Sequence, residues 1–134
     1  MARPVEPLAD YPHEAYDAEY YERIARDRAS VRWRLRWLDE LLPVSPGERV
    51  VDLGCGAGRV SAHLAGRGAE VEAVDLSPEA VEYARTRWSE AGRLRFLACD
   101  ATHCEHLGAG RFDKAVSVDV IEHVLDDVME RLFA

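Results

Sequence analysis

The sequence has few of the features that mark membrane-spanning, secreted or nucleic-acid-binding proteins. No apolar run approaches the ~20 residues of a membrane-spanning helix, and residues 1–7 lack the hydrophobic stretch of a secretory signal. The three cysteines, Cys55, Cys99 and Cys104, form no disulfide framework. The net charge of -8 disfavours nucleic acid and anionic membranes, because neutralising phosphates needs a basic face. We expect a cytoplasmic protein that binds neither.

The length of 134 residues suffices for one compact domain, which follows a tail and a helical segment. From Tyr16 to Leu42 the pattern is helical, because four apolar residues at steps of four, three and four share one face: Val31, Leu35, Leu38 and Leu42. Trp33 and Trp37 form an adjoining stripe that we expect to contact the core. Pro43 and the segment 45–47 end the helix, so we divide the chain into residues 1–45 and 46–134.

After Gly47, strand-like and helix-like segments alternate with short connections. Strands are predicted at Arg49–Leu53, Val71–Val74, Leu94–Ala98 and Ala115–Val118. Helices are predicted up to about Ala65, from Ser77-Pro78 onward, and from near Val120 towards Ala134. Such alternation means parallel strands joined by right-handed crossovers, so we predict an α/β fold with a doubly wound sheet.

The most informative motif is the glycine-rich turn after the first strand. Asp52 is followed by glycines at every second position, Gly54, Gly56 and Gly58, with Cys55 between the first two. Glycines allow positive φ and a close approach of the backbone to a ligand. The helix that begins at once presents free amides to polar or anionic atoms. We therefore predict that this turn binds a ligand.

The spacing of the glycines separates two classes of ligand. Dinucleotide dehydrogenases use Gly-x-Gly-x-x-Gly, but the last position of that pattern is Arg59 here, and the third glycine comes one residue early, at Gly58. The stretch 52–58 resembles instead the first motif of class I S-adenosylmethionine-dependent methyltransferases, Asp/Glu-x-Gly-x-Gly-x-Gly. The resemblance implies a Rossmann-like sheet, here of strand order 3-2-1-4, and S-adenosylmethionine as cofactor.

Further landmarks follow in the order of that family. Asp75 ends the second strand 19 residues beyond the second glycine of the turn, with Leu76 next, and an acidic residue there can accept hydrogen bonds from ribose hydroxyls. The resemblance implies that Asp100 accepts from the adenine amino group and that the amide of Ala101 meets the ring. It also implies that three residues line the methionine end of the cofactor: Ser117, Val118 and Asp119.

These landmarks resemble those of small-molecule methyltransferases of the ubiquinone-biosynthesis O-methyltransferase type. The resemblance implies that Arg34, 20 residues before Gly54, contacts the cofactor carboxylate, which a guanidinium can bind through both oxygens. It also implies that residues 16–36 form a lid, with Tyr20 or Tyr21 as a wall. We predict a methyltransferase that acts on a small-molecule acceptor.

Methyl transfer from a sulfonium mainly requires the nucleophile and the methyl carbon to be held in line, with water excluded. A general base helps a hydroxyl acceptor, and His123 is the candidate for it. Asp119, Glu122 and His123 resemble a metal-binding pattern of related enzymes, but small-RNA 2'-O-methyltransferases need a further downstream histidine, so we predict no metal. Another set matches no standard zinc spacing: Cys99, His103, Cys104 and His106.

Two other classes of function stay open. The family sheet has seven strands in the order 3-2-1-4-5-7-6 and this sequence supplies four, so a module that binds S-adenosylmethionine without catalysis is one alternative. An NAD-dependent oxidoreductase is the other, and the spacing of Gly58 counts against it. We also expect self-association through the edge of the fourth strand, where Val116 and Val118 would lie beside unpaired backbone groups.

Overall fold

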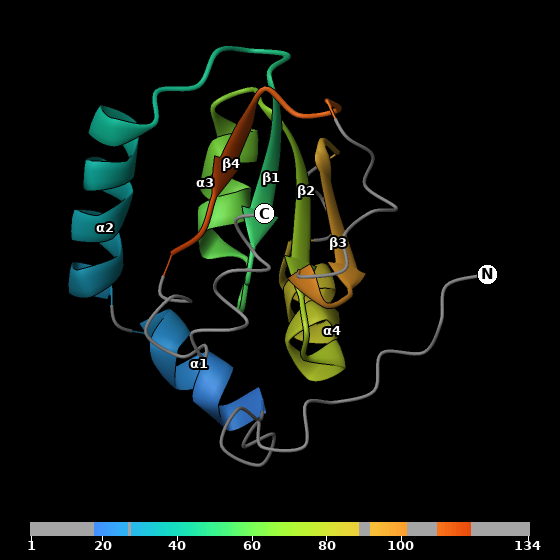
Figure 1. The fold of residues 1–134 in the computed structure, drawn as a ribbon. Helices are drawn as coiled ribbons and strands as arrows, with labels where there is room; N and C mark the ends of the chain where they lie inside the picture. Colours follow the sequence, from blue (N-terminus) through green and yellow to red (C-terminus); the bar gives the residue numbers. More distant parts are fainter. Residues whose placement is uncertain (1–17, 27, 89–91, 102–109, 119–134) are drawn as a thin grey trace, which may run out of the picture.

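The protein is built on a four-stranded parallel sheet with helices packed against it (Figure 1). The computed structural model describes residues 18–26, 28–88, 92–101 and 110–118. In chain order the elements are α1 (Ala18–Arg26), α2 (Arg28–Leu41), β1 (Arg49–Leu53), α3 (Arg59–Gly66), β2 (Glu70–Asp75), α4 (Pro78–Arg87), β3 (Leu94–Ala98) and β4 (Lys114–Val116). None of the helices within these ranges is long and apolar enough to span a membrane.

The strand order β3-β2-β1-β4 confirms the predicted Rossmann-like α/β arrangement. Val50 of β1 lies opposite Val71 of β2 on one side and opposite Lys114 of β4 on the other. The predicted bounds of the first three strands agree with the structure to within one residue, whereas β4 is shorter than expected and ends at Val116. Because all strands run in the same direction, their carboxyl ends meet at one edge of the sheet, and the glycine turn lies there.

The helices α2, α3 and α4 cover one face of this sheet. Alternate strand residues point to the same side, so Val50, Val71 and Val116 pack together against Leu38 of α2 and Leu64 of α3. A second cluster on the same face includes residues of α4: Cys55, Ala73, Val81, Ala84 and Phe96. The helix predicted from near Val120 lies outside the described residues.

The predicted helical stretch from Tyr16 to Leu42 consists of two helices with different partners. α2 buries Leu38 in the core beside the sheet, and Leu35 and Leu42 pack against the same cluster, as their periodicity predicted. α1 instead packs against α4, where Tyr21 stacks on Tyr83 with the ring centroids 6.1 Å apart. A single continuous helix could not contact both regions, which lie apart in Figure 1.

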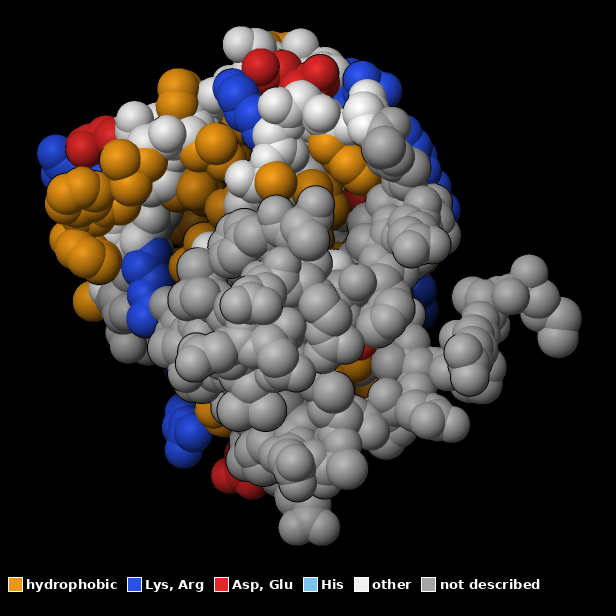
Figure 2. Space-filling view, in the orientation of Figure 1, with side chains coloured by type: hydrophobic (Ala, Val, Ile, Leu, Met, Phe, Trp, Pro, Cys, Tyr) orange, Lys and Arg blue, Asp and Glu red, His pale blue; other side chains and the backbone are white. Residues whose placement is uncertain are grey.

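The prediction that Trp33 and Trp37 contact the core is wrong. These side chains are 62% and 47% exposed, and Leu41 on the same side of α2 is 74% exposed. Hydrophobic side chains accordingly gather over α2 at the left of Figure 2. Leu38 follows Trp37 by one residue and so lies about 100° further round the helix, which turns the tryptophans away when Leu38 faces the sheet.

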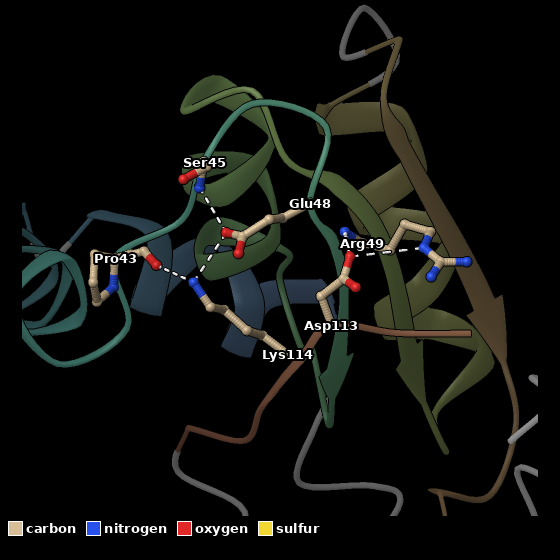
Figure 3. Close-up of polar contacts among 6 residues, drawn as sticks. All are labelled: Pro43, Ser45, Glu48, Arg49, Asp113 and Lys114. Carbon is tan, nitrogen blue, oxygen red and sulfur yellow. Dashed lines mark hydrogen bonds and ion pairs between the residues drawn. The ribbon is translucent and has the colours of Figure 1, made fainter. Parts of the chain in front are cut away.

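Polar contacts join the start of β4 to the start of β1 (Figure 3). Lys114 Nζ donates to Glu48 Oε2 at 2.9 Å and also to the carbonyl oxygen of Pro43. Beside it, Asp113 Oδ2 accepts a hydrogen bond of 2.8 Å from the backbone amide of Arg49. These contacts fix the register of the short β4 strand at the amino end of the sheet, opposite the glycine turn.

The outer edge of β3 carries a side-chain cap on its backbone. In the register of β3 with β2, the carbonyl of Phe96 points away from the neighbouring strand. Arg85 of α4 donates to this carbonyl from Nε at 3.2 Å and from Nη2 at 2.7 Å. One arginine thus occupies a backbone acceptor that would otherwise be available to an added strand.

We expect Leu64→Ala to lower the free energy of unfolding by about 2–5 kcal/mol, because Leu64 is 1% exposed and its removal leaves a cavity between α3 and the sheet. Leu41→Ala is the matched control, since the same atoms are removed from a side chain that is 74% exposed, and it should shift stability by less than about 0.5 kcal/mol. Urea unfolding of both variants measures this. Equal losses would contradict the assignment of the core.

Candidate functional site

The turn between β1 and α3 follows a path that only glycine adopts easily. Gly54, Gly56 and Gly58 have φ values of 77°, 51° and 79°, in the left-handed region that side chains disfavour. The amides of Gly54 and Cys55 both donate to the carbonyl of Val74 in β2, at 2.8 and 2.9 Å. The alternating glycines are therefore required by the backbone itself, and the turn is anchored to the neighbouring strand.

Asp75, at the end of β2, fastens the middle of this turn. Its Oδ2 atom accepts from the amide of Gly56 at 2.8 Å, and its Oδ1 atom accepts from the amide of Ser77 at 2.9 Å. Burial raises the pKa of Asp75, while these two amide hydrogen bonds act in the opposite direction. The backbone amide of Leu76 also lowers the pKa, and since a carboxylate can accept about four hydrogen bonds, Asp75 keeps capacity for a further donor.

The space around the turn is as restricted as its backbone. A Cβ atom on Gly58 would lie 2.7 Å from the ring of Phe96 and 3.1 Å from Cβ of Ala84. On the other side, a Cβ atom on Gly56 would lie 3.8 Å from the ring of Tyr21, which is 5% exposed. α1 therefore places Tyr21 against the turn, at the position where a wall of the site was expected.

Asp52 is buried beneath the turn. It is 1% exposed, and its Oδ2 atom accepts a hydrogen bond of 2.5 Å from Ser61 Oγ in α3. Burial raises the pKa of Asp52 to about 7; the Ser61 hydrogen bond opposes this rise and the nearby charge of Asp75 adds to it. Burial likewise raises the pKa of the Cys55 thiol, whose side chain packs in the cluster with Phe96. The structure thus shows Asp52 and Cys55 in contact with the protein interior.

The remaining predicted site residues come from the ends of the other strands. Leu76 follows β2, and Asp100 and Ala101 follow β3, all partly buried. Ser117 Oγ donates to the carbonyl of Leu53 at 3.1 Å, which joins the end of β4 to the end of β1, and Val118 packs against the core. Arg34 lies on α2 with an exposed side chain. Its predicted contact with the cofactor remains a prediction.

Several predicted residues fall outside the described ranges: Asp119, Glu122 and His123, and with them His103, Cys104 and His106. Within the ranges that are described, no group of three or more His, Cys, Asp or Glu side chains could hold a metal ion. The roles expected for these residues, including that of His123 as a base, stay predictions.

One residue that contacts the turn, Trp88, was not predicted to belong to the site. This residue follows the end of α4 and donates its indole Nε1–H to the carbonyl of Ala57 at 2.9 Å. Ser61, the partner of Asp52, was likewise not singled out. A tryptophan at a helix end resembles any other core residue in sequence, and only the fold shows that it reaches a turn 31 residues away.

The sheet has this strand order, a glycine turn follows its first strand, and an acidic residue ends its second. These features define the cofactor-binding half of a Rossmann-like fold. The model of the family described as "Methyltransferase domain" matches residues 50–134. The chain belongs to this family, among the class I S-adenosylmethionine-dependent methyltransferases.

Known proteins similar to this chain are named as methyltransferases. The ubiquinone biosynthesis O-methyltransferase of Thiobacillus denitrificans is 36% identical over 94 residues, which cover 69% of this chain and 40% of the relative. That of Xylella fastidiosa is 38% identical over 96 residues, covering 69% and 38%. The chain therefore spans about two fifths of the length of these curated relatives.

Solved structures agree in fold. Magnesium protoporphyrin IX methyltransferase from Synechocystis, with S-adenosylhomocysteine bound, has a TM-score of 0.67 at 23% identity, covering 90% of this chain and 63% of that one. A phosphoethanolamine N-methyltransferase of Haemonchus contortus, also with S-adenosylhomocysteine, has a TM-score of 0.66 at 31% identity, covering 76% and 24%. S-adenosylmethionine is the cofactor of the family.

We expect Gly58→Ala to destabilise the protein by about 2–4 kcal/mol, since a side chain there combines a left-handed φ with a clash against the buried Phe96 ring. Gly66→Ala is the control, because nothing lies within 4 Å of a Cβ atom at that position and φ is not in the left-handed region, so it should leave stability unchanged or slightly higher. Chemical unfolding measures both. Similar stabilities for the two variants would show that the turn is not constrained as described.

The buried Asp52 carboxyl should make stability depend on pH. Its pKa of about 7 in the folded protein exceeds the ordinary value of 3.8, so the folded state holds an extra proton between these values, and the resulting stabilisation is lost as the pH rises through 7. Asp52→Asn removes this dependence. The free energy of unfolding of the variant minus that of the parent should be larger at pH 8 than at pH 5, by on the order of 2 kcal/mol. A difference that stays constant with pH would refute the shifted pKa.

Proposed function

We propose that this chain binds S-adenosylmethionine at the carboxyl edge of its sheet and takes part in methyl transfer to a small-molecule acceptor. The observation that carries the proposal is the carboxylate of Asp75, held at the end of β2 by the amides of Gly56 and Ser77. Its oxygens have fixed positions, and the carboxylate keeps acceptor capacity for a further donor, which suits a hydroxyl of a ribose ring.

The charge of this edge supports the same ligand. Asp75 and Asp100 lie at or near the ends of β2 and β3, with Arg59 at the start of α3 as a neighbouring cation. S-adenosylmethionine carries a sulfonium and an ammonium against one carboxylate, so it is cationic overall. An acidic residue at the end of the second strand also suits the ribose of a dinucleotide, so charge alone does not separate the two ligands. The glycine spacing, with Gly58 one residue earlier than in Gly-x-Gly-x-x-Gly, favours S-adenosylmethionine over NAD.

The other predicted cofactor contacts fit this placement. We assign Asp100 and the amide of Ala101 to the adenine, since they follow β3 beside the strand that ends in Asp75. Ser117 and Val118 follow β4 on the other side of β1, which suits the methionine end. Tyr21 and α1 lie against the turn and would limit the access of water, as a lid does. The site then runs along the edge of the sheet from β3 to β4.

The acceptor is proposed to be a small molecule with a hydroxyl group, because the relatives from Thiobacillus denitrificans and Xylella fastidiosa are named as O-methyltransferases. The bound cofactor supplies an already activated methyl group. The chain's own residues then need to hold the cofactor in one orientation and exclude water, which accounts for a rigid turn and a covering helix. Removal of the hydroxyl proton is the role predicted for His123.

We expect Asp75→Asn to weaken binding of S-adenosylhomocysteine about ten- to a hundredfold, since hydrogen bonds to a charged acceptor contribute about 1.5–3 kcal/mol. Calorimetric titration measures the affinity. Asp113→Asn is the matched control, because Asp113 lies at the amino end of the sheet and accepts from Arg49 instead. An analogue without the two ribose hydroxyls separates direct from indirect effects.

The parent should bind that analogue more weakly than S-adenosylhomocysteine, whereas Asp75→Asn should bind the two about equally. Unchanged affinity of the variant for S-adenosylhomocysteine would exclude Asp75 as the ribose ligand. If the variant binds more weakly but still prefers S-adenosylhomocysteine over the analogue as strongly as the parent does, its loss of affinity comes from a disturbed Gly56 amide and not from a lost contact with the ribose.

A further inference from the structure

The indole of Trp88 is a second side chain from outside the glycine turn that is bonded to its backbone, after Asp75. Trp88 follows the last residue of α4, and its own backbone amide donates to the carbonyl of Ala84 at 2.9 Å, which fixes where the side chain starts. The indole Nε1–H then donates to the carbonyl of Ala57 at 2.9 Å. The guanidinium of Arg87 lies over the indole ring, 4.6 Å from its centroid, and holds the ring from the solvent side.

The hydrogen bond from Trp88 completes the fixation of one particular peptide group. The carbonyl of Ala57 belongs to the Ala57–Gly58 peptide, whose N–H donates to the carbonyl of Cys55 at 2.9 Å. This peptide is therefore held at both ends, by Trp88 on its oxygen and by Cys55 on its nitrogen. A peptide bonded at one end only can rotate about the flanking φ and ψ, and glycine at 58 offers little resistance to such rotation.

A second peptide of the turn is held in the same way. The Cys55–Gly56 peptide donates its N–H to Asp75 and accepts from Gly58 on its carbonyl. The Gly56–Ala57 peptide lies between the two, so its direction is set by its neighbours. The turn thus depends on two side chains from outside it, Asp75 from β2 and Trp88 from the end of α4.

We infer that Trp88 is a positioning residue for the cofactor site: its indole N–H holds the Ala57–Gly58 peptide in the conformation that the turn presents to the cofactor. This inference rests on the proposed binding of S-adenosylmethionine, and it adds a residue outside the family motif to the site. Trp88 acts through the backbone of the turn. Loss of its N–H should weaken cofactor binding by loosening the turn, with the hydrophobic core left in place.

Trp88→Phe tests this, since it removes the N–H donor and keeps an aromatic ring at the position. We expect affinity for S-adenosylhomocysteine to fall about three- to tenfold, as for the loss of one hydrogen bond. Hydrogen exchange at the Gly58 amide, measured without ligand, should accelerate by a similar factor. Exchange at Ala73, which lies in the core cluster against which the ring of Trp88 packs, should change much less than exchange at Gly58, because the lost hydrogen bond belongs to the turn.

Trp37→Phe is the matched control, the same substitution at a side chain that is 47% exposed on α2, and it should alter neither readout. The chain has three tryptophans, so the indole N–H signals of the parent can be assigned from the two variants and Trp33→Phe. We expect S-adenosylhomocysteine to shift the Trp88 signal and to leave the other two in place.

Exchange at Gly58 that is unchanged in Trp88→Phe would overturn the inference. So would an acceleration that is equal at Gly58 and Ala73, since that outcome reports a general loss of stability. If the parent bound no S-adenosylhomocysteine, the proposed function would fail, and the comparison of Gly58 with Ala73 would still decide whether Trp88 holds the turn.

Discussion

The close approach of the glycine turn to the ring of Phe96 sets the arrangement of the whole site. The Cα atom of Gly58 comes so near that ring and Ala84 that a side chain has no room. β3 and α4 can therefore lie directly behind the turn, and this brings the end of α4 close enough for Trp88 to reach Ala57. The turn's left-handed backbone and its tight packing are two aspects of one constraint, because both require the missing Cβ atoms.

The buried carboxylates beside the turn have a cost in the protein without its cofactor. Burial raises the pKa of both Asp52 and Asp75, which means that their charged forms are less favourable than in water. A cationic ligand at the same edge would offset part of this unfavourable electrostatic energy. Residues that disfavour the empty site in this way are common where binding takes precedence over stability. The proposed cofactor and the electrostatics of the apo protein are consistent with each other.

Much of the fold could be predicted from local sequence patterns. The strand bounds, the Ser77-Pro78 start of α4 and the strand order follow from apolar periodicity, capping chemistry and the family motif, which all act over a few residues. The periodicity of α2 also identified its buried face correctly. The periodicity did not show that Trp33 and Trp37 face outward. Two apolar faces of one helix look alike in sequence, and only the tertiary structure shows which one packs against the sheet. In the site, too, sequence spacing pointed to Asp75 as a candidate residue. The contacts of Trp88 with Ala57 and of Ser61 with Asp52 depend on tertiary packing, so the sequence could not predict them.

The guanidinium of Arg85 on the carbonyl of Phe96 has a consequence for how this protein meets other chains. An edge strand exposes backbone groups at alternate residues, and intermolecular strand pairing begins with hydrogen bonds to them. A foreign strand approaching β3 would have to displace a charged donor that already makes two hydrogen bonds to the central residue of a five-residue strand. The positive charge would also remain beside the incoming backbone. Within the described residues, one long side chain from a neighbouring helix thus occupies the central backbone acceptor of this edge and disfavours the pairing of another strand with it.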